Sequence, residues 1–569
     1  MPSAVDQQPQ VNPWIVAIAV MFATFMEVLD TTVVNVSLPH IAGSLSVSTD
    51  EAAWALTSYL VANAIILPMT GWIANYFGRK RTLLAAVFGF TAASFLCGLA
   101  TSLPMLILFR VVQGATGGAL QPLSQAVMLE AFPPRDRGKA MAFWGLGIVV
   151  APMLGPVIGG YLTDNFSWRW VFYINLPVGL ASVIMTRLFI FDPPYIGRQK
   201  RGVDYWGIGM LALGVGALQV VLDKGQEDDW FAANWIVVAT VISLAALVLF
   251  VVHELNTREP VVHLRVFKDR TYAAGVFLMT MLGFVLYGSL LLLPIFLQTM
   301  LGYPALNAGI AMAPRGLGSF LMMPLVGTVL GRFDPRKVLA AGLVGASWTL
   351  YQLSNLNLNA GYWDIFWPQF VQGAALALLF VPLTTATMDP IPKEEMGNAT
   401  SMFNLMRNLG GGFGIAAATT TVAAAAARIR VDTGHDRAVP MAGIGDRLVA
   451  HVHRCRRSEE DDDLAAEALR AFRLAHRQVL VGVSGALRDF LFEVRRAPGV
   501  EIGDELLSVG IRVEFRPLIP LRFRHEVPLR AVRPVSVLRQ PGKCGNCKRQ
   551  HSYRDEQIFE AFHRSSPGG

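Results

Sequence analysis

Long apolar runs separated by short polar segments occupy residues 14–426. Thirteen runs are present, and twelve are long enough to cross a hydrocarbon core of about 30 Å as helices that rise about 1.5 Å per residue. The twelve are 14–34, 52–74, 82–100, 105–129, 140–162, 171–190, 205–222, 235–252, 272–298, 305–330, 338–356 and 363–387, and the weaker thirteenth is 402–426. The pattern predicts an all-α polytopic membrane protein.

The composition agrees with a chain that lives in lipid. Of the 569 residues, 53% are hydrophobic and only 16% are charged, whereas soluble proteins carry roughly 25% charged residues. Residues 1–12 are polar and lack a basic cluster, so we expect no cleavable signal peptide. The sequence contains neither a Walker loop nor a Gly-x-Ser-x-Gly motif. We therefore expect a protein that is not an enzyme and that holds no cofactor or metal.

Lys and Arg are concentrated in every second connection between the runs. One set of connections carries them, at 79–81, 135–139, 198–201, 258–270, 332–337 and 393. The intervening connections hold only Arg169 and Lys224. Because positively charged connections stay on the cytoplasmic side, the pattern predicts a multi-pass protein of the cytoplasmic (inner) membrane with its N-terminus inside.

Ionisable residues interrupt the first and the fourth of the apolar runs. Glu27 and Asp30 lie three residues apart in the first run, on one helical face, and Arg110 lies in the fourth. An ionised Asp at the centre of a spanning helix costs on the order of 2.5–3.5 kcal/mol, so such residues usually face a bundle interior or a wet pathway. An Asp30–Arg110 ion pair that forms or breaks with protonation is what proton coupling requires. The alternatives are that the acids end the first helix at the interface and that Arg110 snorkels to the headgroups.

A short glycine-containing basic connection occurs at 71–81 and, more faintly, at 327–337. Its repetition at corresponding places is typical of transporters built from parallel half-repeats. The predicted organisation is a cytoplasmic tail at 1–13, a six-helix bundle at 14–190, a linker with two extra spans at 191–271, an incomplete second bundle at 272–426 and a basic non-membrane tail at 427–569.

Several motifs, in order, resemble the fourteen-span drug:proton antiporters of the EmrB/QacA type within the major facilitator superfamily. The motifs are LDTTVVNVSLP at 29–39, the connection at 71–81, RVVQG at 110–114, Gly147 with GPVIGG at 155–160, WRWVFYINLPVG at 168–179, Pro294 with Gln298, and PRG at 314–316. The resemblance implies a proton-coupled multidrug efflux transporter with two six-helix halves and a two-helix insert, its last helix missing here.

The resemblance also implies roles for individual residues. Proton coupling falls to Asp30, Glu27 and Arg110; the substrate cavity to Gln113, Asn35, Asn63, Arg315 and Gln298; the flexible antiporter motif to Gly147, Gly155, Pro156, Gly159 and Gly160; and the cytoplasmic loop motif to Gly71, Asn75, Gly78, Arg79, Lys80 and Arg81. Asn75 stands where the family usually has an acid. The implied partners are amphipathic small molecules, protons and membrane lipid, together with a periplasmic adaptor and an outer-membrane channel; no nucleic acid is expected.

The resemblance stops near residue 418, and the chain beyond it has a different character. The last 142 residues hold 25 of the 48 Lys and Arg and 3 of the 4 Cys, and their longest apolar patch, 479–487, is too short to span. Cys544 and Cys547 with His551 make at most half of a zinc site, and 459–463 is a solvated acidic run. Cys97, in an apolar span, is expected to serve packing.

We interpret the weak run at 402–426 as a segment that does not cross the membrane, which leaves the tail in the cytoplasm. We interpret the sequence after about Thr420 as the product of a reading-frame change or gene fusion. Three alternatives to the antiporter remain open: an exporter of a single metabolite, a truncated inactive transporter, and a membrane-anchored protein whose basic tail is the working part.

Overall fold

The computed structural model describes residues 12–192, 203–228, 230–257, 259–330, 332–357 and 359–432. Every regular element in these ranges is helical. The α-helices are α1 Pro13–Leu45, α2 Thr49–Phe77, α3 Arg79–Leu99, α4 Leu103–Gly117, α5 Leu120–Ala131, α6 Arg137–Asn165, α7 Trp170–Tyr173, α8 Asn175–Phe189, α9 Tyr205–Lys224, α10 Asn234–Asn256, α11 Arg270–Ile295, α12 Ala305–Val329, α13 Pro335–Ser354, α14 Tyr362–Met388 and α15 Met396–Asp432. The predictions for the basic tail, including its cysteines and its acidic run, lie outside the described residues.

Eleven segments of the described chain are long and apolar enough to cross a membrane. They correspond to the first ten predicted runs and to the twelfth. The eleventh run forms α13, a 20-residue helix that falls short on apolar composition. The all-α polytopic fold expected from the hydrophobic pattern is therefore confirmed.

Helix α1 is longer than its apolar run. Asn12 caps its start by accepting a hydrogen bond from the Trp14 backbone N–H at 3.0 Å, and Pro13 occupies the first turn, where its missing N–H costs nothing. The helix then continues through Pro39 and ends where Ser46 adopts a left-handed conformation. The two acids consequently lie in the middle of α1, and the alternative in which they end the helix is wrong.

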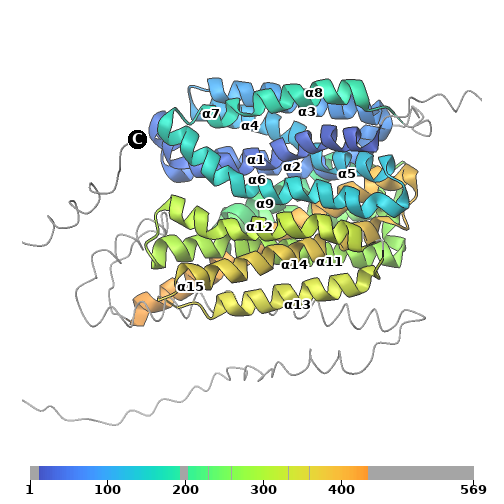
Figure 1. Cartoon of the computed structure of the whole chain (residues 1–569). Helices are drawn as coiled ribbons and strands as arrows, with labels where there is room; N and C mark the ends of the chain where they lie inside the picture. The colour runs from blue at the N-terminus through green and yellow to red at the C-terminus, as the bar shows by residue number, and fades with distance from the viewer. Residues whose placement is uncertain are drawn as a thin grey trace, which may run out of the picture. The chain divides into compact units, whose positions relative to one another are not determined.

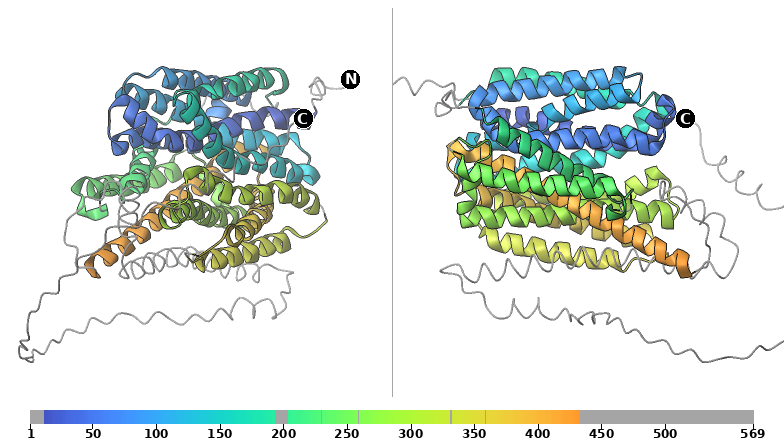
Figure 2. Two further views of the ribbon diagram at one scale, coloured as in Figure 1. Left: turned by 60° about the vertical axis from the view of Figure 1, so that its left-hand side comes forward. Right: turned by 180° about the vertical axis from the view of Figure 1, so that it is seen from behind.

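The helices form two groups in the described chain (Figure 1). Helices α1 to α8 make the upper group in that view, and α11 to α15 make the lower one. Helices α9 and α10 pack on each other, and α9 also contacts α2 and α15. Figure 2 shows the same two groups from the side and from behind. In chain order, α9 and α10 lie between the two groups.

The weak run at 402–426 does not lie outside the bundle. It belongs to α15, which packs along α11 and also against α2 and α5. Its hydropathy is low because it carries polar side chains such as Asn404 and Arg407, and these are buried against partners in the first half. Hydropathy alone underestimates such a helix.

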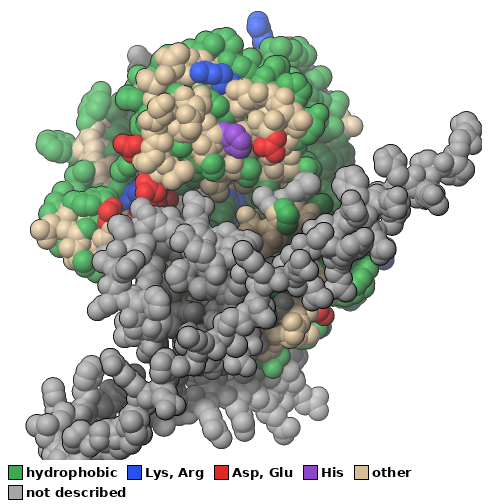
Figure 3. All heavy atoms as spheres, turned by 90° about the vertical axis from the view of Figure 1, so that its left-hand side faces the viewer, with side chains coloured by type: hydrophobic (Ala, Val, Ile, Leu, Met, Phe, Trp, Pro, Cys, Tyr) green, Lys and Arg blue, Asp and Glu red, His purple; other side chains and the backbone are tan. Residues whose placement is uncertain are grey.

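The outer surface carries the apolar residues that a lipid-facing helix needs. Large hydrophobic side chains are exposed along α10, where Val241 is 62% and Leu244 is 65% exposed. Figure 3 looks onto the helix ends and shows charged side chains over that end face, with hydrophobic side chains around its outline. This distribution agrees with helices that cross a bilayer and charges that stay at its surface.

Candidate functional site

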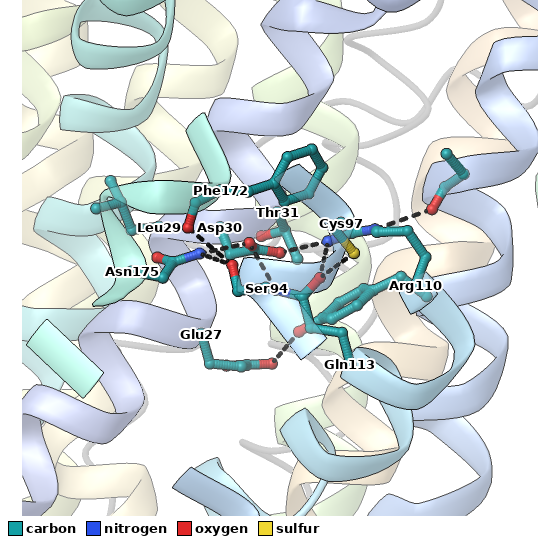
Figure 4. Close-up of polar contacts among 12 residues, drawn as sticks. Glu27, Leu29, Asp30, Thr31, Ser94, Cys97, Arg110, Gln113, Phe172 and Asn175 are labelled. Carbon is teal, nitrogen blue, oxygen red and sulfur yellow. Dashed lines mark hydrogen bonds and ion pairs between the residues drawn. The ribbon is translucent and has the colours of Figure 1, made fainter. Parts of the chain in front are cut away.

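The predicted ion pair between α1 and α4 is present and fully buried. Arg110 Nη1 donates to Asp30 Oδ2 at 2.6 Å, and neither side chain is exposed. Figure 4 shows the two side chains pointing at each other between their helices. The alternative in which Arg110 snorkels to the headgroups is wrong, because its guanidinium reaches inward to a carboxylate. A fully buried ion pair needs further hydrogen bonds to offset the free-energy cost of removing both charges from water.

Neighbouring side chains supply those hydrogen bonds. The second carboxylate oxygen of Asp30, Oδ1, accepts from Gln113 Nε2 at 2.9 Å and from Asn175 Nδ2 at 2.7 Å. Arg110 donates to Gln113 Oε1 at 2.8 Å and, through Nε, to the Ala55 carbonyl at 3.0 Å. Both charges are thus held by groups from α2, α4 and α8.

Aromatic and thiol groups surround this cluster. The Arg110 guanidinium lies over the Tyr59 ring, 4.2 Å from its centroid, which adds a cation–π contact. Asn175 also donates to Ser94 Oγ at 3.0 Å. Cys97 is buried, and its Sγ lies 3.5 Å from Gln113 Oε1, so the residue expected only to pack also touches the polar cluster.

Glu27 belongs to a different polar cluster, although it shares a helix with Asp30. Its carboxylate accepts from Asn63 Nδ2 at 3.1 Å, from Gln121 Nε2 at 2.5 Å and from the Tyr59 hydroxyl at 3.4 Å. All these donors are neutral. The Gln121 carbonyl oxygen in turn accepts from Arg407 Nη2, on α15. Glu27 is therefore connected through one amide to a cation of the second helix group.

A parallel contact joins the same two helices, α5 and α15. Asn404 Nδ2 donates to Gln125 Oε1 at 2.5 Å. Gln121 and Gln125 lie four residues apart on α5, hence on one face, and their partners on α15 lie three apart. The two helix groups are thus held together at this depth by one amide–amide contact and one guanidinium–amide contact. Neither contact is an ion pair.

The glycines of α6 let that helix approach α1 closely. A methyl group placed on Gly155 would lie 2.6 Å from Thr32 Cβ, and one on Gly159 would lie 3.0 Å from the Val33 carbonyl oxygen. A methyl on Gly147 would meet the flexible end of Met21 at 3.1 Å. Gly160, by contrast, has nothing within 4 Å. The helix continues through Pro156.

Adding one methyl group at Gly155 is expected to separate α6 from α1. Gly155→Ala should lower the free energy of unfolding by about 1–3 kcal/mol, the usual cost of overpacking, because β-branched Thr32 has little rotamer freedom. Gly160→Ala is the matched control on the same helix and should be neutral or slightly stabilising. Thermal unfolding of the purified variants measures both, and equal midpoints would contradict the close contact.

The loop motif at the start of α3 contacts the second helix group. Arg79 forms an ion pair with Glu130 and donates through Nη2 to the Lys393 carbonyl at 3.3 Å. A methyl on Gly71 would meet the Asn398 backbone nitrogen at 2.6 Å.

Within the same motif, Gly78 turns the chain with φ of 93°, which favours glycine, and the Lys80 backbone N–H donates to Asp192 at 2.7 Å. Asn75 is half-buried, and Arg81 lies in the first turn of α3.

Three predicted cavity residues lie away from both acid clusters. Asn35 is exposed on α1, and Gln298 is exposed in a π-helical turn, Phe296–Met300, that follows α11. Arg315 is buried on α12, inside the second helix group. Asn63 and Gln113, by contrast, contact the two carboxylates directly.

The sequence did not point to several of the residues that complete the site. Asn175 lies in a motif recognised at 168–179, yet nothing in that motif indicates that its amide binds Asp30. Gln121 follows RVVQG by only a few positions, and Arg407 interrupts a weak apolar run as Arg110 interrupts a strong one. That shared oddity, a cation inside an apolar run, is the signal that would have identified Arg407.

Comparison with known proteins places this geometry in context. Residues 20–415 match the family model described as the Major Facilitator Superfamily. The chain is 41% identical over 402 residues to the multidrug export protein EmrB of Haemophilus influenzae, and the match covers 70% of this chain and 78% of that protein. It is 40% identical over 402 residues to the fatty acid resistance protein FarB of Neisseria gonorrhoeae, covering 70% and 79%.

Solved structures share the fold at low sequence identity. The human organic anion transporter MFSD10 superposes with a TM-score of 0.53 at 14% identity, covering 82% of this chain and all of that one. The proton:xylose symporter XylE gives a TM-score of 0.51 at 15% identity, covering 82% and 94%.

Proposed function

This chain belongs to the major facilitator superfamily, and from that premise we propose that it exports amphipathic organic compounds across the cytoplasmic membrane in exchange for protons. Its relatives at about 40% identity include proteins named for multidrug export. In each of these, the region matched by this chain covers more than two thirds of the relative's length. The chain is accordingly a multidrug efflux transporter, and its membership of a family of transporters agrees with the absence of an enzymatic motif in the sequence.

The observation that carries proton coupling is the buried Asp30–Arg110 pair. A carboxylate with no exposure, held by one cation and two amide donors, can exist in two well-defined states. When ionised it binds Arg110; when protonated it no longer attracts the guanidinium. A proton therefore changes the contacts between α1 and α4, which is a differential interaction of the kind that can shift a conformational equilibrium.

The close α1–α6 packing gives that change a route to the rest of the fold. Because Gly155 and Gly159 place α6 against the residues just after Asp30, a shift of α1 must move α6 or open the contact. Helix α6 also packs on α12 of the second group. Three other contacts join the two helix groups: the hydrogen bonds of Gln121 and Gln125 on α5 to α15, and that of Arg79 to the Lys393 carbonyl. These hydrogen bonds must break when the two groups rock apart.

The orientation and the partners extend this proposal. The loop motif at 71–81 lies on the cytoplasmic side and acts as the inner latch, and the N-terminus lies in the cytoplasm. Substrates enter as amphipathic molecules from the cytoplasm or the inner leaflet. In a bacterium with two membranes, a periplasmic adaptor and an outer-membrane channel would carry them onward.

Proton-gradient-dependent dye efflux tests the function directly. The full chain, reconstituted in proteoliposomes with an imposed pH gradient, is expected to move ethidium against its concentration gradient. Collapsing the gradient with a protonophore should stop transport. Transport that survives the protonophore, or that is confined to a single metabolite in a panel of unrelated compounds, would overturn multidrug antiport; no transport of any compound would indicate an inactive chain.

Glu27 is expected to govern preference for cationic substrates. Its carboxylate is bound only by neutral donors and lies where the two helix groups meet, so a cation that approaches there gains an attraction that a neutral molecule does not. Glu27→Gln should therefore reduce efflux of ethidium more than efflux of an uncharged dye, and Glu51→Gln, at a helix cap, should leave the ratio unchanged. Equal reduction of both dyes would argue against the assignment.

A further inference from the structure

The second helix group contains a cavity that is separate from both acid clusters. It is bounded by α11, α12, α13 and α14, and most of its lining is leucine. Three polar residues also line it: Ser289, Arg315 and Gln372. They come from three different helices and are all at least nine-tenths buried. A single polar group in an apolar void is common, but three converging ones indicate a binding site.

Arg315 has no counter-charge among the described residues that line this cavity. It is only 6% exposed, and none of the ion pairs in the described part of the chain includes it. Its neighbours in the lining are neutral, and Gln372 Nε2 donates to Ser289 Oγ at 3.4 Å. A buried cation is costly unless it is paired, so the cavity is arranged to receive an anion or another strong acceptor.

The rest of the cavity is an apolar slot that leads away from the polar end. Leu278 lies eleven residues before Ser289 on α11, and Leu383 lies eleven residues after Gln372 on α14. Helices that rise about 1.5 Å per residue carry the slot about 16 Å from the polar groups. Leu343 of α13 closes the slot on a third side. The lining is therefore amphipathic along its length.

The slot lies where the first helix group has a helix and the described part of the second group has none. Helix α8 packs between α1 and α3 in the first group. Their counterparts by chain order are α11 and α13, and no described helix packs between these two; α13 lies at the edge of the group, against α14 (Figures 1 and 2). Within the described residues, no helix covers the slot on the side between α11 and α13.

We propose that this slot binds a single-chain alkyl carboxylate, with the carboxylate on Arg315 and the chain along the leucines. Arg315 is the eleventh residue of the 25-residue α12, so the anion lies near the middle of the membrane. A phospholipid cannot place its headgroup there, because the headgroup remains at the interface. A carboxylic acid can cross apolar surface in its neutral form and ionise beside the guanidinium. The site is separate from the Asp30 cluster and does not depend on export.

Photolabelling tests the proposal with the full chain in phosphatidylcholine nanodiscs. The probe is a long-chain fatty acid that carries a diazirine, and labelled peptides are identified by mass spectrometry. Labelling is expected on α11, α13 or α14, and oleate should compete whereas oleyl alcohol, with the same chain and no carboxylate, should not. Competition by phosphatidic acid instead of oleate would assign the slot to phospholipid and overturn the proposal.

Two pairs of variants separate binding from misfolding. Arg315→Gln removes the cation, and Arg336→Gln, at the exposed start of α13, is its control. Leu343→Trp fills the slot, and Val344→Trp, at a position 53% exposed on the outer face, is its control. Labelling should fall to background in the first member of each pair and persist in the second, with all four proteins monodisperse. Full labelling of monodisperse Arg315→Gln or Leu343→Trp would overturn the proposal.

Discussion

Replacing Asp30 by Asn is expected to abolish transport driven by a proton gradient while leaving downhill substrate movement. Asparagine has nearly the same shape and keeps an oxygen that can accept from Gln113 and Asn175. It can neither bind a transported proton nor neutralise Arg110. The two states that protonation distinguishes therefore collapse into one, and the gradient no longer biases the conformational equilibrium. In proteoliposomes, ethidium should equilibrate across the membrane but should not accumulate against its gradient.

The comparison of driven and downhill transport separates lost coupling from lost folding. A misfolded variant loses both activities, whereas an uncoupled one loses only the first. Asp164→Asn is the matched control, because Asp164 is an exposed acid whose carboxylate lies 3.8 Å from the exposed His40 imidazole. This variant should keep both activities. Gradient-driven accumulation by Asp30→Asn at the rate of the unmodified chain would exclude Asp30 from proton coupling.

The proton-coupling pair could be anticipated from the sequence because two rare events coincide in it. Asp30 and Arg110 are charges inside otherwise apolar runs, and the cost of leaving either one alone in lipid makes a partner necessary. The chain offers few candidates at a similar depth, so pairing them is a short step. Most of the helices, and the apolar character of their outer surface, could also be predicted from the sequence. Both follow from the length of the apolar runs.

The hydrogen-bond partners could not be anticipated in the same way. Asn175, Gln121 and Gln125 are ordinary polar residues in membrane helices, and which carboxylate or amide each one contacts depends on helix rotation and crossing. A helical period fixes the face relative to neighbours on the same helix, but not the direction of that face in the bundle. Glu27 and Asp30 show this well: they share a face by spacing, yet they contact different helices.

Helix α15 shows the limit of hydropathy as a guide to the bundle. It carries Asn404 and Arg407 where an isolated spanning helix would carry apolar residues, and both are buried against α5. A helix whose buried polar groups find hydrogen-bond partners on a neighbouring helix can enter the bundle at a hydropathy that a window criterion rejects. Arg315 in the same half is the opposite case, because none of the described residues supplies a counter-charge to it, and its cavity stands out for that reason.

Arg110→Gln is expected to be the most destabilising of the substitutions considered. It removes the cation and leaves the Asp30 carboxylate buried, which should lower the free energy of unfolding by about 3–5 kcal/mol. The double variant Asp30→Asn with Arg110→Gln removes both charges and replaces an ion pair by two neutral amides. Its loss of stability should therefore be much smaller than the sum of the two single losses, and a double-mutant cycle measured by thermal unfolding gives the difference.

The Asp136–Lys139 pair provides the control for that cycle. Its atoms are 2.8 Å apart, similar to the buried pair, but its two side chains are 25% and 46% exposed. Solvent screens such pairs, so its coupling energy should lie between about 0 and 1 kcal/mol. A large coupling for the buried pair beside a small one for the surface pair identifies burial, not distance, as the source of the energy. Simple additivity of the Asp30 and Arg110 losses would mean that the two charges do not depend on each other, and proton exchange between them would then have no energetic basis.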